Sequence, residues 1–282
     1  TNPPTTTTLV ANGRCWQWHS SSTATAPGGS FTPLHLLIEN GIITKISDSP
    51  ISAPPQAKVI DAANQIILPG LIDSHIHVTM TGESKYFVDL SKCTSISDLK
   101  AAVLSHSKKH PDHSVIQGVG WDQEKLGGFP SSSDLDSLSL TDKTIWLWRA
   151  CWHIGCGNSR ALSLAKAAEW VGEGGEVERD VSGKLTGVLK ERACELVAPI
   201  LGEKSDAEST KFILDGLDMC VESGLTAVAT NEMTPATHLY KNLHSQKKLR
   251  PRVFLTPMAE ELDSDPGLRP FTTPDRLLKV DR

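Results

Sequence analysis

The 282-residue sequence lacks several features that would assign a protein to a broad class at once. No apolar run approaches the roughly 20 residues that a membrane-spanning helix needs. Basic residues do not outnumber acidic ones: the net charge is -5 and the pI is about 6.0. This balance argues against nucleic acid or an anionic membrane as a partner. The start, Thr1-Asn2-Pro3-Pro4, lacks the basic and apolar segments of a signal peptide.

A cysteine framework is also missing. The six cysteines are scattered along the chain, and no two of them form a C-x-x-C pair. This distribution favours a reduced, cytoplasmic protein over a disulfide scaffold. Cys151 and Cys156 flank His153, but their spacing matches no common zinc motif, so we expect small buried residues near a strand and its turn.

What the sequence does contain is a pair of histidines behind an apolar stretch. Residues 66–78 read as an apolar run, the break Pro69-Gly70, a second apolar run, and then His75 and His77. Side chains i and i+2 of a β-strand point to the same face, so the two imidazoles are predicted to project together. They would form half of a site for a divalent metal such as zinc. The alternative is an exposed strand with two incidental histidines, which the surrounding motif disfavours.

Residues before this stretch predict a small antiparallel sheet. Asn40-Gly41 lies between two apolar runs and predicts a tight hairpin, because both residues tolerate positive φ. Ser20 to Ser30 is rich in serine, threonine, alanine and glycine and predicts a surface loop. The β-like runs cover residues 9–13, 34–38, 41–46 and 58–61.

After residue 70, strand-like and helix-like segments alternate, which favours a parallel sheet with helical crossovers. The histidine strand is predicted to run from Leu71 to Val78, and a loop is predicted from Thr79 to Ser91. Further strands are expected at 115–122, 144–153, 225–230 and 252–256. Helices are expected at 97–106 (opened by Ser97 or Asp98), 158–170, 205–220 and 235–243.

These motifs carry a family resemblance. Leu68 to His77 resembles the first barrel strand of the amidohydrolase superfamily, whose metal-dependent hydrolases carry a His-x-His there. The later blocks resemble amidohydrolase family 3, in the branch that includes N-substituted formamide deformylases. The blocks are Gly120-Trp121-Asp122, the acidic-Leu-Asp step at 134–136, the strand ending at His153, Asn158 with Ala161-Leu162, and residues 183–191. Their common order extends the resemblance over residues 9–280.

The resemblance implies an α/β fold built on a metal-dependent hydrolase (β/α)8 TIM barrel. Residues 1–70 would be the N-terminal part of a β-sandwich domain, and 71–282 the N-terminal part of the barrel, with an inserted α+β subdomain at about 82–200. Predicted barrel strands number about three of eight, whereas a complete barrel needs about 250 residues. We therefore expect a truncated barrel, a fragment of a longer enzyme, with exposed strand edges that lower stability.

The resemblance also implies the function: hydrolysis of carbon–nitrogen bonds in non-peptide amides or formamides by metal-activated water. His75 and His77 would bind one or two divalent metal ions, most simply zinc. The catalytic aspartate is expected beyond Arg282, so the fragment alone is expected to be inactive. The implied partner is a small-molecule substrate, with no nucleic acid and no membrane, and a homodimer is compatible with the family. Two alternatives stay open: a cyclic amidase or deaminase of the same superfamily, and a non-catalytic scaffold or interaction protein.

Four residues are second candidates, for pocket walls and substrate hydrogen bonds: Trp121, Asp122, His153 and Asn158. Each has an ordinary alternative, respectively a core residue, a turn residue, a satisfied loop histidine and a helix cap. Asn231 and Glu232 end a predicted barrel strand, where barrel enzymes gather catalytic side chains, although Glu232 could equally be solvated.

Overall fold

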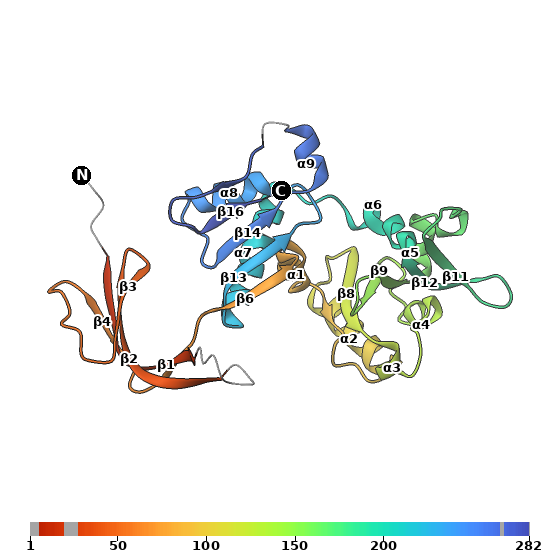
Figure 1. Cartoon of the computed structure of the whole chain (residues 1–282). Helices are drawn as coiled ribbons and strands as arrows, with labels where there is room; N and C mark the ends of the chain where they lie inside the picture. Colours follow the sequence, from red (N-terminus) through yellow and green to blue (C-terminus); the bar gives the residue numbers. More distant parts are fainter. Residues whose placement is uncertain (1–5, 20–27, 266–267, 282) are drawn as a thin grey trace. The chain divides into compact units, whose positions relative to one another are not determined.

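The computed structural model describes residues 6–19, 28–265 and 268–281, and the chain divides into two compact units, Thr1–Gly70 and Leu71–Arg282 (Figure 1). The start inspected for a signal peptide and most of the predicted 20–30 loop lie outside these ranges; only residues 28–30 of that loop are described, and they belong to a strand. Within the described ranges, none of the helices has the length and apolar character needed to cross a bilayer.

The first unit is one mixed sheet in the order β3-β2-β1-β4, with β5 also paired to β1. Its hairpins β1–β2 and β2–β3 are antiparallel, and the second turns at Asn40-Gly41, where both residues have positive φ. However, β4 and β5 run parallel to β1, so the prediction of a purely antiparallel sheet was wrong. The long connection between β3 and β4, residues 48–57, allows a parallel return that a two-residue turn does not, and β5 follows β4 in the same direction. The strands are β1 (Thr7–His19), β2 (Gly28–Glu39), β3 (Ile42–Ser47), β4 (Lys58–Asp61) and β5 (Ile66–Ile67).

This sheet buries little apolar surface. Its described core cluster consists of Cys15, Leu34 and Leu36, with Val10 and Ile67 packed against them. Several large aliphatic side chains stay more than 40% exposed: Ile42, Ile43, Ile46, Val59, Ile60 and Ile66. A second sheet that would complete a sandwich is not present among the described residues of this unit, so the sandwich stays a prediction.

The second unit begins with the barrel-like sheet, ordered β15-β16-β14-β13-β6 (Figure 1). β6 (Leu71–Ile76), β13 (Leu225–Asn231), β14 (Arg252–Thr256) and β16 (Leu278–Val280) are parallel, and β15 (Phe271–Thr272) is antiparallel to β16. The sequence predicted three parallel strands, and the structure has a fourth. The helices of this part are α1 (Val78–Ser84), α7 (Asp206–Glu222), α8 (Thr237–Ser245) and α9 (Ala259–Ser264).

Helices α1 and α7 cross at unusually close range because each contributes a glycine. A Cβ added to Gly82 would lie 1.8 Å from the Phe212 carbonyl oxygen, and one added to Gly216 would lie 2.2 Å from that of Val78. Both glycines are therefore required by backbone contact rather than by a turn. The segment Thr79 to Ser91 was predicted to be a loop, which was wrong for the residues of α1.

Residues between α1 and α7 form a separate sheet, ordered β11-β12-β10-β9-β8-β7. β7, β8 and β9 are parallel, whereas the strands from β9 to β11 pair antiparallel. The strands are β7 (Val88–Asp89), β8 (Val115–Trp121), β9 (Thr144–Arg149), β10 (Ile154–Gly157), β11 (Gly175–Arg179) and β12 (Leu185–Glu191). The helices are α2 (Ile96–Lys109), α3 (Gln123–Leu126), α4 (Ser132–Asp136), α5 (Ser159–Leu164), α6 (Ala198–Leu201) and the 3-10 helices η1 (Ala167–Glu169) and η2 (Arg192–Val197).

Three local predictions in this region need correction. The strand predicted through His153 is a hairpin: β9 ends at Arg149, and Trp152 adopts φ 63° in the turn before β10. The helix predicted from 158 to 170 stops after α5, because Lys166 takes a left-handed conformation with φ 51°. Helix α2 is capped by Ser95, whose side chain accepts the Asp98 N–H, and not by Ser97 or Asp98.

Candidate functional site

The two histidines lie where β6 ends and α1 begins. His75 is the penultimate residue of β6, and His77 is the N-cap residue of α1. The strand is irregular here, since Asp73 to Ile76 pairs opposite the shorter step from Val228 to Thr230. Simple alternation along a strand reaching Val78 is therefore not what brings the rings together. A bulge and a helix start do so, and the ring centroids lie 5.4 Å apart.

Neighbouring strand β13 holds this junction in place. The His77 side chain makes no capping bond, so the first N–H groups of α1 need partners elsewhere. Val78 N–H donates to Thr230 Oγ1 at 3.2 Å, and Thr79 N–H donates to Glu232 Oε2 at 3.2 Å. The side chains of Thr230 and Glu232 thus replace the missing cap. They also hold His77 in place, because it directly precedes the two residues whose N–H groups they bind.

Glu232 serves this structural network rather than open solvent. Its side chain is 5% exposed, and its Oε1 accepts hydrogen bonds from Thr230 Oγ1 at 2.8 Å and from the Tyr240 hydroxyl at 2.6 Å. Burial, together with the adjacent Glu232 carboxylate, raises the pKa of Tyr240, so the phenol stays a donor. The carboxylate is therefore occupied by a helix cap and two hydroxyl donors.

The histidine rings are both held by Asn231, the last residue of β13. His77 Nδ1 donates to the Asn231 carbonyl oxygen in a very short contact. His75 Nδ1 lies 3.2 Å from Asn231 Nδ2. Both contacts use Nδ1, and in the described part of the chain neither Nε2 atom has a hydrogen-bond partner.

This donor set fits part of a metal site. A ring whose Nδ1 is tied to a backbone carbonyl presents the Nε2 lone pair, which is the arrangement commonly found around metal-binding histidines. Across residues 6–19, 28–265 and 268–281, however, no group of three or more His, Cys, Asp or Glu side chains is placed to hold a metal ion. Among the described residues, two candidate ligands are adjacent here and no third one is placed beside them.

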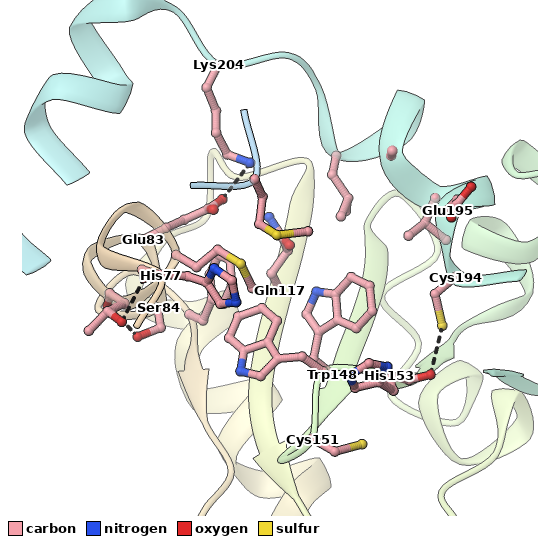
Figure 2. Close-up of a pocket in the computed structure, with 18 of the residues that line it drawn as sticks. His77, Glu83, Ser84, Gln117, Trp148, Cys151, His153, Cys194, Glu195 and Lys204 are labelled. Atoms are coloured by element: carbon pink, nitrogen blue, oxygen red, sulfur yellow. Dashed lines mark hydrogen bonds and ion pairs between the residues drawn. The ribbon is translucent and has the colours of Figure 1, made fainter. Parts of the chain in front are cut away.

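A cavity of about 820 Å³ opens beside His77 (Figure 2). Its walls come from α1, from the turn after β9 and from η2 and α6. Aromatic side chains form much of the wall: the Trp152 ring centroid is 5.8 Å from that of Trp148 and 6.2 Å from that of Phe87. The volume falls in the range of small-molecule sites, which are mostly apolar with a few polar groups.

The charged groups of the cavity wall are paired with one another, and Arg192 Nε lies 3.9 Å from Glu195 Oε1. Lys204 Nζ lies 3.0 Å from Glu83 Oε1, and burial raises the pKa of the Glu83 carboxyl despite this neighbour. His153 Nδ1 lies 3.1 Å from Glu191 Oε2. The Cys151 thiol also lines the wall (Figure 2).

Of the four residues proposed for substrate contact, only His153 lines this cavity. Trp121 is fully buried, and its indole N–H donates to the Leu147 carbonyl oxygen at 2.9 Å. Asp122 is the N-cap of α3 and accepts the Glu124 N–H. Asn158 is 4% exposed, caps α5, and bonds Ile145 N–H and the Lys143 carbonyl oxygen. These three side chains have the ordinary structural roles.

Sequence reasoning missed the aromatic wall. Trp148 and Trp152 stand in a segment with three of the seven tryptophans of the chain, and that concentration was the available signal. It was not decisive because Trp146, in the same strand, is completely buried. Met80 and Gln117 also line the cavity, although nothing in their sequence context marks them.

Comparison with known proteins gives consistent matches. The family model described as "Amidohydrolase family" matches residues 58–279. The N-substituted formamide deformylase of Arthrobacter pascens is 29% identical over 209 residues, which cover 70% of this chain and 38% of the deformylase. YtcJ of Bacillus subtilis (strain 168), named as an amidohydrolase, is 26% identical over 184 residues, covering 64% of this chain and 35% of YtcJ.

A solved structure agrees with these matches. The crystal structure of an uncharacterized metal-dependent hydrolase from Pyrococcus furiosus is 25% identical and superposes with a TM-score of 0.64, covering 97% of this chain and 55% of that one. The chain spans less than half the length of the two curated relatives and about half of the solved structure.

Proposed function

The chain belongs to the amidohydrolase family, and from this premise we propose that it forms the histidine edge and the substrate cavity of a metal-dependent hydrolase of non-peptide carbon–nitrogen bonds. One observation carries the proposal: His75 and His77 meet at the carboxyl end of a parallel strand, with His77 in the wall of a cavity of about 820 Å³. Barrel enzymes gather their chemistry at this end of the strands.

His75 and His77 are the residues that would hold the metal, and zinc is the cation that two imidazoles suit best. When bound, such a cation polarises a carbonyl group and lowers the pKa of a coordinated water to near 7. The chain itself contributes the orientation of the rings through Asn231 and a wall that excludes water. The proposed reaction needs further ligands and a proton-transferring carboxylate in addition to these two histidines.

The substrate is proposed to be a small amide or formamide with an apolar substituent. Trp148, Trp152 and Phe87 offer flat apolar surface near His77, whereas the charged groups of the wall are paired with one another. An uncharged substituent would thus displace water from aromatic rings without breaking an ion pair. His153, at the cavity edge, is the polar candidate for contact with the substrate.

The metal assignment is tested by titration. The wild-type protein and the double variant His75→Ala/His77→Ala are titrated with zinc, and bound metal is measured by elemental analysis after gel filtration. We expect the double variant to lose at least tenfold in affinity, because removal of both imidazoles removes the ligands. The control His106→Ala/His110→Ala removes two histidines from the end of α2 and should bind as the wild type does.

The reaction class is tested by product analysis. A form of the protein that carries the further ligands and the proton-transferring carboxylate is loaded with zinc and incubated with N-substituted formamides, a cyclic amide and an aminopurine, and formate, ring-opened acid and ammonia are measured. Formate release that disappears in His77→Ala would support the proposal, whereas ring opening or ammonia would favour the cyclic amidase or the deaminase. Unchanged metal binding in the double variant, with no turnover of any substrate, would favour a non-catalytic scaffold.

A further inference from the structure

Asn231 occupies a position from which a single residue reaches both histidines. It ends β13, pairs with Thr256 of β14 on one side, and lies beside the irregular end of β6 on the other. Its carbonyl oxygen contacts His77 and its side-chain amide contacts His75. The two contacts are chemically different, because one partner is backbone and the other can be changed by mutation.

The contact with His77 defines the proton on that ring. A carbonyl oxygen only accepts hydrogen bonds, so His77 Nδ1 must carry hydrogen, and in the neutral ring Nε2 then carries the lone pair. Because the acceptor belongs to the backbone, this tautomer does not depend on the side chain at position 231.

The contact with His75 leaves a choice. With Nδ2 facing the ring, the amide donates to an unprotonated Nδ1, and the hydrogen of the neutral ring is then on Nε2. With the amide turned by half a rotation, Oδ1 accepts from Nδ1–H and Nε2 is free. A histidine binds a metal only through a nitrogen without hydrogen, so the amide orientation decides whether His75 Nε2 is a ligand.

We propose that Asn231 is a positioning residue whose side chain sets the tautomer of His75, and that metal binding selects the orientation in which Oδ1 faces Nδ1. The proposal rests on the proposed function, in which His75 and His77 bind the metal. Asn231 would then be the one residue of the neighbouring strand that holds both rings at Nδ1. It also predicts that the two histidines respond differently to a change at position 231.

The test compares the metal-free protein labelled with ¹⁵N-histidine with its variants Asn231→Asp and Asn231→Ala, all at pH 8. The ¹⁵N shifts and couplings identify which ring nitrogen carries hydrogen. In Asn231→Asp, where the carboxylate only accepts, His75 should shift fully to Nδ1–H. In Asn231→Ala, His75 should give the averaged signals of a solvated ring. His77 should keep Nδ1–H in all three proteins and is the internal control.

A zinc titration of Asn231→Ala supplies the second readout, and we expect about tenfold weaker binding, which is typical of losing a partner that orients a metal-binding histidine. An identical His75 tautomer in all three proteins would overturn the proposal. A change at His77 together with His75 would overturn it as well, since the side chain would then act through the strand. If removing His75 and His77 leaves zinc binding intact, the metal site itself fails, whatever the tautomer result.

Discussion

Among single residues, Cys151 differs from the other cysteines. All six are free, but five are buried, and burial raises the pKa of each of those five thiols. Burial also raises the pKa of Cys151, yet hydrogen bonds from Arg149 and from the His153 N–H outweigh it, so the pKa lies below its ordinary value. A partly exposed thiol of lowered pKa in a cavity wall is expected to be reactive.

We therefore expect iodoacetamide to alkylate Cys151 first, with a rate that rises at lower pH than for an ordinary thiol and falls as the pH drops through the folded-state pKa. Arg149→Met removes the guanidinium and should raise that pKa; a rise of about one unit lowers the thiolate fraction about tenfold. Peptide mapping by mass spectrometry over a pH series measures both effects. Arg252→Met, at an exposed arginine of β14, should leave the profile unchanged.

At the same scale, the sequence predicted the closeness of two histidine rings from an incomplete argument. The spacing of His75 and His77 predicted neighbouring rings, and the rings are neighbours, but a bulge and a helix start produce the arrangement. The role of Asn231 was not visible, because it depends on a contact 154 residues away in sequence. Polar residues that cap helices, such as Asn158, look the same in sequence as residues that bind a ligand.

At the scale of elements, helices α1 and α7 cross backbone against backbone. Gly82 and Gly216 each face the backbone of the opposite helix, so neither leaves room for a methyl group. Helix propensity alone would make alanine more stabilising than glycine by roughly 1 kcal/mol of unfolding free energy at either position. A glycine-to-alanine substitution should raise the free energy of unfolding if propensity dominates and lower it if the close packing dominates. The sign of this change therefore separates the two effects.

We expect Gly82→Ala and Gly216→Ala each to lower the free energy of unfolding by about 1–3 kcal/mol, as overpacking of a close contact does. Urea unfolding followed by circular dichroism gives the change in midpoint. Ala101→Gly, on the exposed side of α2, calibrates the propensity effect and should cost about 1 kcal/mol. Stabilisation by either alanine would contradict the close crossing.

Helix α1 also shows why part of this region was not predictable. Its sequence, Val-Thr-Met-Thr-Gly-Glu-Ser, has β-branched residues and a glycine, which disfavour a helix, and it has no capping side chain of its own. Thr230 and Glu232 supply the cap from β13. Strands β8, β13 and β14 were predictable because their apolar and β-branched residues lie close together in the sequence, whereas α1 depends on partners far along the chain.

At the scale of the whole molecule, both units expose large aliphatic side chains. Ile43 and Val59 of the first unit are 52% and 57% exposed, and Leu71 and Ile72 of β6 are 61% and 62% exposed. In the described part of the second unit, β6 is an edge strand. Exposed apolar surface of this kind marks interaction sites or aggregation risk.

We expect the native protein to bind the dye ANS and to self-associate with increasing concentration. Ile43→Lys/Val59→Lys, in the first unit, should reduce the dye fluorescence without changing the far-UV circular dichroism, because these side chains contribute exposed surface and not core. Light scattering over a concentration series checks the association. Ser49→Lys, which adds a charge at an exposed polar position, should leave both measurements unchanged. Equal fluorescence of all three proteins would argue against the exposed sheet as the dye site.

The broad fold was predictable from ordered sequence motifs, whereas strand directions and turns were not. The ordered motifs from Leu68 to Asn158 predicted the amidohydrolase superfamily, and the family match confirms it. The mixed α/β content was predicted correctly, whereas the parallel return of β4 and β5 and the hairpin at Trp152 were not. Strand direction and chain reversal depend on partners and turn geometry, which apolar periodicity does not report.

The ion pair between Glu83 and Lys204 has a consequence for how the segment between α1 and α7 can evolve. The chain passes through α1, builds an entire second sheet, and comes back before α7 at Lys204, whose Nζ lies 3.0 Å from Glu83 Oε1 in α1. A segment whose two ends meet can be exchanged, enlarged or shortened without rerouting β6 and β13. The aromatic wall belongs to this excursion, whereas His75 and His77 belong to the sheet that it leaves. Selection can therefore vary the aromatic wall separately from the strand end that carries the two histidines.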